Sequence, residues 1–104
     1  MPTKQTAIKK ARKFLLECQQ LPFHIDKAIL FGSATKGNAT PYSDIDLALF
    51  SNQFSDNILK NLDMIGIINI RYPDMDVHTY PLSSFSQQGI LMEQIKKTGI
   101  EIKL

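Results

Sequence analysis

The sequence has little cysteine, little net charge and no long apolar run, and each shortage excludes a class of protein. Its one cysteine, Cys18, has no partner for an intrachain disulfide and cannot by itself form a structural zinc site. No segment approaches the ~20 apolar residues of a membrane-spanning helix. The N-terminal residues lack the apolar run of a signal peptide. We therefore expect a cytoplasmic protein with no membrane segment.

The remaining composition is that of a globular protein. With 104 residues, of which 43% are apolar and 21% charged, the chain can bury one hydrophobic core and lies outside the disordered class. It contains no internal repeat, low-complexity tract or linker, so we expect a single domain over residues 1–104. The formal net charge of +2 is too small to indicate nucleic-acid binding by itself.

Basic residues are nevertheless concentrated near the N-terminus. Five of the twelve lie in the first predicted helix: Lys4, Lys9, Lys10, Arg12 and Lys13. A solvated helix face is the simpler interpretation. A basic surface that attracts RNA or a nucleotide acceptor is the alternative.

The spacing of apolar residues predicts helices and strands in alternation. Helices are expected over residues 4–19, about 55–66 and from Ser83 or Ser84 to about Lys97, and strands over 28–31, 45–50, 74–80 and 100–104. Asn52 or Ser55 is expected to cap the second helix, and Gly99 to end the last one. Residues 67–70 could extend the second helix or lead into a strand. The predicted fold is a mixed α/β domain, with a small sheet flanked by helices.

A Gly-Ser turn and the loop after it suggest a phosphate-binding site. Gly32 allows the backbone to approach a ligand and to adopt a positive φ. Ser33 offers its hydroxyl and its N–H to a phosphate oxygen. If residues 33–37 begin a helical turn, their N–H groups form an anion site. The loop is not a P-loop, because it lacks the Gly-Lys-Ser/Thr ending of that motif.

Asp44 and Asp46 follow on the next predicted strand. Two carboxylates two residues apart on a strand point to the same face, and such like charges repel unless a cation lies between them. Carboxylates together with phosphates suit Mg²⁺ or Mn²⁺. Two metals about 3.5–4 Å apart can activate an attacking hydroxyl and stabilise the leaving oxygen, an arrangement that usually needs a third carboxylate.

Asp76, inside the strand predicted over 74–80, is the candidate for that third carboxylate. Asp74 shares its face and would replace it if the strand register were shifted by two residues. Taken alone, both residues would be interpreted as solvent-exposed side chains of an edge strand without a functional role. The pair Asp44 and Asp46 favours the functional interpretation.

Two histidines and a tyrosine are weaker candidates. His78 shares the face of Asp76 and could approach a metal or an acceptor, although a satisfied or exposed histidine is the simpler interpretation. Tyr42 could stack on a base, although a loop tyrosine more often only packs. His24, in a connection, carries no functional argument.

The motif formed by Gly32-Ser33, Gly37 and Ser43–Leu47 resembles the signature of the DNA polymerase β-like nucleotidyltransferase superfamily. The length and the segment Asp76-Val77-His78 look most like its minimal nucleotidyltransferase family. The resemblance extends from about residue 6 to residue 103, and its specificity lies in residues 32–47. It implies a mixed sheet flanked by helices and the transfer of a nucleoside monophosphate from a triphosphate to a hydroxyl.

The resemblance also implies roles for the acidic residues. Asp44 and Asp46 would bind both metals, Mg²⁺ or Mn²⁺. Asp76 would bind the metal that activates the acceptor and would help to remove the acceptor's proton. These three residues are therefore the expected catalytic residues and metal ligands.

The expected nucleotide-binding residues are Gly32, Ser33, Lys36 and Ser43, with Gly32 and Ser33 holding the triphosphate. One departure from the family concerns Lys36, since many relatives have arginine before the second glycine. Lysine keeps the positive charge but loses the bidentate fork, so the hold on phosphate is expected to be weaker.

The leading hypothesis is a metal-dependent nucleotidyltransferase that uses a nucleoside triphosphate, with ATP expected. Proteins similar to this one commonly act as antitoxins beside a HEPN-type helical protein, which implies a hetero-oligomer with an AMP-modified tyrosine on that partner. A homodimer, an antibiotic acceptor and an RNA-end acceptor remain open. A competing hypothesis is a catalytically weak antitoxin that neutralises a helical partner by occlusion, and a third is a basic RNA-binding domain that uses the first helix.

Overall fold

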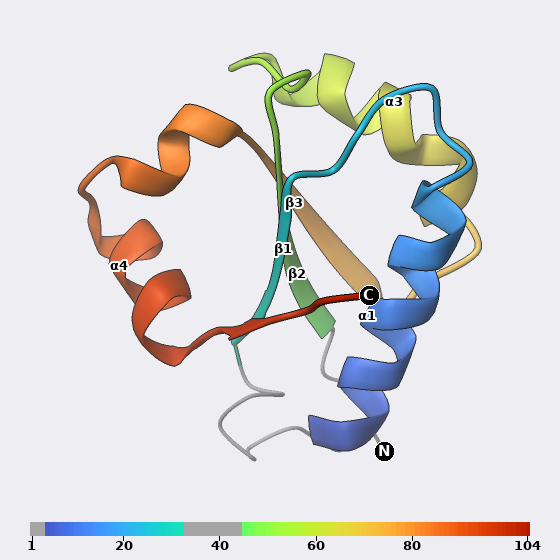
Figure 1. The fold of residues 1–104 in the computed structure, drawn as a ribbon, viewed down its shortest axis with the longest axis horizontal. Helices are drawn as coiled ribbons and strands as arrows, with labels where there is room; N and C mark the ends of the chain where they lie inside the picture. The colour runs from blue at the N-terminus through green and yellow to red at the C-terminus, as the bar shows by residue number, and fades with distance from the viewer. Residues whose placement is uncertain (1–3, 33–44) are drawn as a thin grey trace.

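The computed structural model describes residues 4–32 and 45–104, and Figure 1 shows their arrangement. The elements follow in the order α1 (Lys4–Cys18), β1 (Lys27–Phe31), β2 (Ile45–Ser51), α3 (Ile58–Asn69), β3 (Met75–Pro81), η1 (Leu82–Ser86), α4 (Ile90–Thr98) and β4 (Ile100–Glu101). The predicted mixed α/β fold is confirmed. Within the described ranges, no helix is long and apolar enough to cross a membrane.

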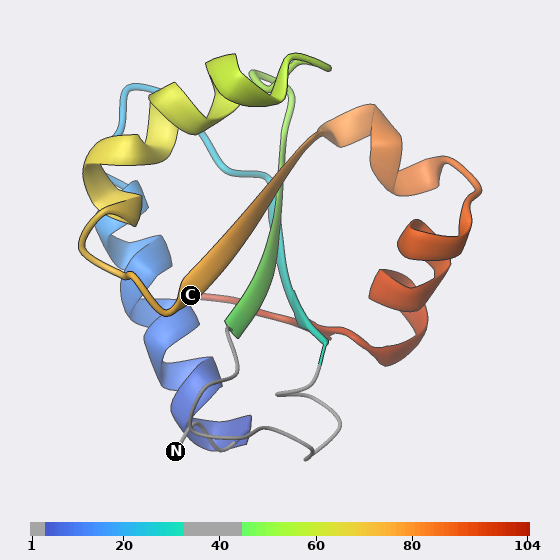
Figure 2. The ribbon, with the colours of Figure 1, turned by 180° about the vertical axis from the view of Figure 1, so that it is seen from behind.

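The strands form one four-stranded mixed sheet in the order β3-β2-β1-β4. β1 runs antiparallel to β2 and to β4, whereas β2 and β3 run parallel. α1 and α3 cover one face of the sheet, and η1 and α4 cover the other (Figures 1 and 2). The parallel pair matters most for function, because it places the beginnings of β2 and β3 at the same end of the sheet.

Side chains of β2 alternate between two separate cores. Leu47 and Leu49 join the larger core beneath α1 and α3, whereas Ala48 and Phe50 join the smaller core beneath α4. All four are fully buried. Burial of a leucine or phenylalanine side chain contributes roughly 1.5–3 kcal/mol, so the centre of the sheet is fixed from both sides.

α1 matches the helix predicted over residues 4–19 to within one residue. Its apolar residues recur at helical spacing, and the buried ones are Ala7, Ala11, Phe14, Leu15 and Cys18. Burial raises the pKa of the Cys18 thiol to about 12. Cys18 is therefore a packing residue of the larger core.

Two side chains of α1 tie this helix to the connection that leads into β3. Glu17 accepts hydrogen bonds from the Tyr72 hydroxyl and, at 2.8 Å, from Arg71 Nη1, and these bonds lower the pKa of the Glu17 carboxyl. Lys10 forms an ion pair with Asp74. The start of β3 is thus held in place from the larger-core side of the sheet.

The expected capping of the second helix is wrong, since α3 begins three residues later than predicted. Asn57 is the N-cap, and its side chain accepts from the backbone N–H of Lys60 at 3.1 Å. The carboxamide of buried Asn61 bonds both backbone groups of Ser55, so Ser55 is held in the loop before the helix. At the other end, residues 67–69 continue α3 and Ile70 is its C-cap, which settles the open choice over 67–70.

The single last helix predicted up to Lys97 is also wrong, because the segment divides into η1 and α4. The break falls at residues 87–89, where Gly89 is the N-cap of α4, and glycine is a poor helix former. Gly99 ends α4 as expected, but with an extended φ of −77°. A Cβ at Gly99 would collide with the Ile95 carbonyl and with Ile29. The terminal strand is shorter than predicted.

Candidate active site

Three polar side chains meet at the end of the sheet where the parallel strands begin. Asp46 of β2 and Asp76 of β3 are directly opposite partners in the parallel register. His78 Nε2 lies 3.3 Å from Asp46 Oδ1 and 3.4 Å from Asp76 Oδ2. One ligand atom from each residue lies within 4.8 Å of the other two. The geometry is that of a small site for a cation.

The cluster is reachable from solvent, but unevenly. The side chain of Asp46 is 27% exposed, that of His78 32% and that of Asp76 53%. Asp76 therefore lies at the outer side of the cluster and Asp46 deeper, beside β1. A ligand that approaches the sheet would meet Asp76 with little change in the surrounding protein.

The strand period explains why these side chains share one face. On β2, Asp46 belongs to the same face as Ala48 and Phe50, and on β3, Asp76 belongs to the same face as His78. This is the face covered by α4. Leu47, one residue after Asp46, points into the larger core. The sequence prediction that Asp46 faces away from the core of α1 and α3 agrees with this placement.

Phe31 at the end of β1 and Gly32 after it lie next to the cluster. The Phe31 ring packs against the His78 imidazole with 5.2 Å between ring centroids, which limits how the imidazole can turn. Gly32 has the expected positive φ, +84°. A Cβ at this position would collide with Asp46 Oδ2, so glycine makes room for the Asp46 carboxylate. Its predicted contact with a nucleotide stays a prediction.

The sequence favours Asp76 over Asp74 as the third carboxylate, and the strand register shows that the two residues lie at different places. The role of Asp76 stays a prediction. Asp74 precedes β3, its carbonyl accepts from the Ile45 N–H at 2.8 Å, and its carboxylate pairs with Lys10. Asp76 is the residue opposite Asp46. The two-residue register shift that would exchange their roles does not occur.

Other predicted site residues lie outside the described residues. They are the first carboxylate of the Asp-x-Asp motif, three nucleotide-binding candidates of the loop and the candidate base-stacking tyrosine: Asp44, Ser33, Lys36, Ser43 and Tyr42. Their roles stay predictions. Among the described residues, sequence reasoning gave too little weight to His78 and none to Phe31, because only the register of β1, β2 and β3 brings both beside the carboxylates.

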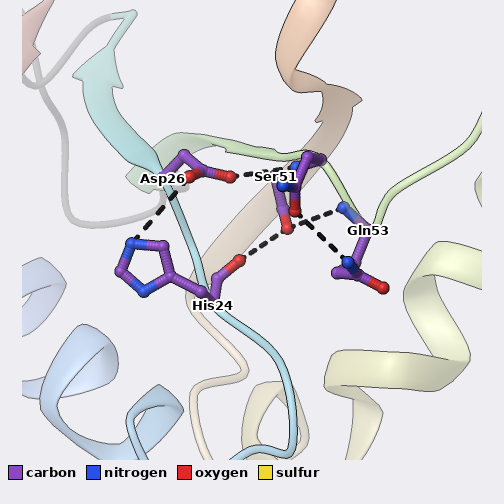
Figure 3. Close-up of polar contacts among 5 residues, drawn as sticks. His24, Asp26, Ser51 and Gln53 are labelled. Carbon is purple, nitrogen blue, oxygen red and sulfur yellow. Dashed lines mark hydrogen bonds and ion pairs between the residues drawn. The ribbon is translucent and has the colours of Figure 1, made fainter.

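His24, for which the sequence offered no functional role, lies at the opposite end of the sheet, where its groups support a turn (Figure 3). Its carbonyl accepts from the buried Ser51 Oγ at 2.6 Å. Ser51 Oγ in turn accepts from the Gln53 N–H at 3.1 Å, and Asp26 accepts from the Asn52 N–H at 2.9 Å. These bonds fix the connection after β2.

A cavity of about 780 Å³ opens beside this turn, at the end of the sheet away from the carboxylates. Its lining includes Cys18, Phe23, Lys27 and Glu101. Lys27 and Glu101 lie 3.9 Å apart as an ion pair, so these two opposite charges neutralise each other. At the carboxylate cluster, by contrast, three ionisable side chains converge on one small space.

Comparison with known families identifies the class to which this α/β domain belongs. The family model described as nucleotidyltransferase domain matches residues 8–100. The chain belongs to this family. The resemblance found in the motif around Gly32 and Asp46 is thereby confirmed at the level of the family.

Solved structures show the same fold at low sequence identity. The chain is similar to a protein of Sulfolobus solfataricus described as a nucleotidyltransferase (TM-score 0.69, 18% identity, covering 94% of this chain and 80% of that one). It is similar to a toxin–antitoxin with AMP-PNP (0.61, 22%, 88% and 72%). It is also similar to a complex of tri-AMPylated Shewanella oneidensis HEPN toxin with MNT antitoxin (0.56, 23%, 97% and 72%). No curated protein matches the sequence.

Proposed function

We propose that this nucleotidyltransferase domain transfers AMP from ATP to a hydroxyl group of a HEPN-type helical partner and so acts as an antitoxin. The observation that carries the proposal is the direct cross-strand pairing of Asp46 with Asp76. Two carboxylates in register on adjacent strands repel each other unless a cation or a hydrogen-bond donor lies between them. The arrangement is therefore suited to a site that takes up a metal.

The chemistry of these side chains fits Mg²⁺ or Mn²⁺. Asp46 and Asp76 offer hard carboxylate oxygens, and the ligand atoms of the cluster lie within 4.8 Å of one another. Asp46 and Asp76 would hold the ion together with Asp44, which the Asp-x-Asp spacing predicts to face the same way. The ion would neutralise phosphate charge and make the acceptor hydroxyl more acidic.

Asp76 and Asp46 have different tasks in the proposed reaction. Asp76, the more exposed carboxylate, accepts the proton of the acceptor hydroxyl. The acceptor oxygen then forms a bond to the α-phosphorus, the bond from that phosphorus to the bridging oxygen breaks, and pyrophosphate leaves. Asp46, deeper in the cluster, would help to hold the ion that orients the phosphates. The loop that begins at Gly32 would hold the triphosphate through Ser33, Lys36 and Ser43.

His78 is a positioning residue in this scheme. Its Nε2 reaches both carboxylates, but one N–H donates to only one oxygen at a time. Packed against the tilted Phe31 ring, the imidazole would keep the carboxylates of Asp46 and Asp76 apart and aligned.

The choice of partner rests on the related structures. One of the similar complexes contains an AMPylated HEPN toxin bound to an MNT antitoxin, and another contains AMP-PNP. The proposal extends this pairing to our chain, with a tyrosine hydroxyl as the acceptor and a hetero-oligomer as the working assembly. It includes the cytoplasmic location expected from the sequence.

The test uses labelled ATP, Mg²⁺ and a HEPN-type helical protein, sought in the reading frames beside the gene of this chain and purified together with the chain. We expect label on the helical protein with the native chain and none above background with Asp46→Asn or Asp76→Asn. Asp74→Asn is the matched control, because it removes a neighbouring carboxylate that pairs with Lys10. Equal labelling by the native chain and the Asp76→Asn variant would remove the proposed role of the cluster.

Neutralisation by occlusion is the second candidate, favoured by an apolar surface on α3 that does not involve the carboxylates. Ile58, Leu59 and Ile70 are 62%, 76% and 80% exposed. Under this alternative, the Asp46→Asn and Asp76→Asn variants would still protect cells from the partner. Loss of protection together with loss of labelling would exclude it.

A further inference from the structure

α3 is apolar on nearly every side, although only one side packs on the sheet. Its buried residues are Asn61, Ile65 and Ile68. The exposed apolar residues of the helix and its C-cap, together with Gly66, form what we call the outer side of α3: Ile58, Leu59, Gly66, Ile67 and Ile70. Leu62 borders this side and is partly buried against the larger core. A helix that is apolar all round is normally covered. The outer side therefore has the character of a surface that another molecule covers.

The outer side of α3 continues into the edge of the sheet. β3 is the first strand in the sheet order, and within the described ranges β2 is the strand that pairs with it. A hollow of about 110 Å³ lies along this edge, lined by Ile58 of α3 and by residues 77–80 of β3. The edge and the helix thus form one continuous surface.

A buried hydroxyl in this hollow has no hydrogen-bond partner among the described residues. It is Oγ1 of Thr79, a residue that is only 6% exposed. Such groups are costly when they stay unsatisfied in a protein interior. Thr79 lines the hollow, but its Oγ1 is covered, so an occupant would reach this hydroxyl only after a local rearrangement.

His78 belongs both to the hollow and to the carboxylate cluster. A molecule lying on the outer side of α3 and in the hollow would therefore reach the rim of the active site. Asp76, the exposed carboxylate, is the first catalytic group that it would meet.

We propose that the outer side of α3 and the β3 edge are the docking surface of the helical acceptor protein, placed so that the acceptor hydroxyl reaches Asp76. This inference rests on the proposed function, which requires a hydroxyl at the cluster. α3 carries one cation, Lys60, and one anion, Asp63. A nucleic acid needs several cations on its binding surface, so the charge pattern favours an apolar protein surface.

A helix of the partner suits this surface for a steric reason. A Cβ added at Gly66 would meet open space, with no atom within 4 Å. Glycine in the middle of the outer side leaves a shallow depression between Leu62 and Ile70. An apolar helix can lay its side chains across such a depression at close backbone distance.

The experiment measures binding of the same HEPN-type helical protein to this chain by isothermal titration, and AMP transfer to it by mass spectrometry. Leu59→Asp adds an anion in the first turn of α3, and Ile70→Lys adds a cation at its C-cap. Both charges suit the helix dipole, and both positions are exposed, so the fold is kept. Ile90→Asp is the matched control, since Ile90 is 82% exposed and begins α4 on the opposite face.

We expect Leu59→Asp and Ile70→Lys each to weaken binding at least about tenfold and to lower transfer in parallel, as for interface positions near the centre of a contact. Ile90→Asp should stay within about twofold of the native chain. Magnesium-dependent ATP binding, measured without the partner, should be unchanged in all three variants. Conservative replacement by Leu59→Met should keep binding.

Each remaining outcome decides against one of the two proposals. Unchanged binding and transfer in Leu59→Asp and Ile70→Lys would overturn the docking surface and leave the proposed function standing. Binding that depends on Leu59 without any AMP transfer by the native chain would overturn the proposed function instead. Binding lost in Ile90→Asp alone would place the interface on α4. A homodimer of the native chain broken by Leu59→Asp, with partner binding unaffected, would assign the surface to a second copy.

Discussion

The two faces of the sheet differ in how completely they are covered, and the difference separates stability from chemistry. The face beneath α1 and α3 is packed with apolar side chains along the full length of β2. The face beneath α4 is apolar only at one end, around Phe50 and Ile95, and polar at the other, where Asp46, Asp76 and His78 meet. One strand therefore serves a closed core and an open site through alternate residues.

Neighbouring positions on β2 therefore differ in whether a mutation should affect activity or stability. Asp46 and Leu47 are neighbours in sequence, but one faces the cluster and the other is fully buried in the larger core. Substitutions at the two positions should act on different measurable quantities. The following experiments test this difference between the two faces.

The largest effect is expected from Asp46→Asn. Removal of one carboxylate charge from the cluster should lower AMP transfer by about 10³-fold, or about 4 kcal/mol in transition-state free energy. Labelled-ATP transfer measures this loss, and urea unfolding without metal should show little change in stability. A variant that transfers AMP at the native rate would contradict the metal-holding role of Asp46.

The complementary change on the other face is Leu47→Ala. A fully buried leucine replaced by alanine loses transfer free energy and leaves a cavity, so the free energy of unfolding should fall by about 2–5 kcal/mol. Urea unfolding followed by circular dichroism measures this. AMP transfer per folded molecule should stay near the native value. If activity falls as steeply as it does in Asp46→Asn, the two faces are not separable.

Gly32→Ala tests the boundary between the faces. Alanine at φ +84° is strained, and its Cβ would displace the Asp46 carboxylate. We expect a loss of about 1–3 kcal/mol in stability together with at least about tenfold lower transfer, one decade being about 1.4 kcal/mol. Native activity with reduced stability would show that the position of the carboxylate tolerates displacement.

The smallest effect is expected from Gly66→Ala, and its two consequences have opposite sign. Alanine in the middle of α3 should stabilise the isolated chain by about 0.5–1 kcal/mol, since its Cβ meets open space. Thermal unfolding measures this gain. Under the docking proposal, Gly66→Leu should stabilise the chain as well but weaken binding of the partner, because the larger side chain fills the depression on the outer side of α3.

Much of the fold could be read from the chain because its elements are strongly patterned. α1 and the strands around Leu30, Leu47 and Val77 were predicted nearly to the residue, since apolar spacing identifies them. The start of α3 was predicted too early, because the Asn61 carboxamide holds Ser55 outside the helix. The helix propensities of single residues do not predict such a side-chain contact across six residues. The break before α4 was missed although Gly89 marks it.

The candidate site was predictable only in part. Asp46 follows from the Asp-x-Asp motif, and Asp76 was preferred over Asp74 without a decisive reason. The structure places Asp76 directly opposite Asp46 in the parallel register, whereas Asp74 precedes β3 and pairs with Lys10. The inclusion of His78 and Phe31 in the cluster depends on the same register.

Residue type and spacing along the chain were enough to give most of the elements, the separation of apolar from polar positions on the strands, and the family. Tertiary structure alone decided which acidic residue meets Asp46, where the imidazole lies, and which side of α3 is left apolar and exposed. The physical reason is that strand register and helix packing are set by contacts between residues distant in sequence. Local spacing carries no information about such contacts.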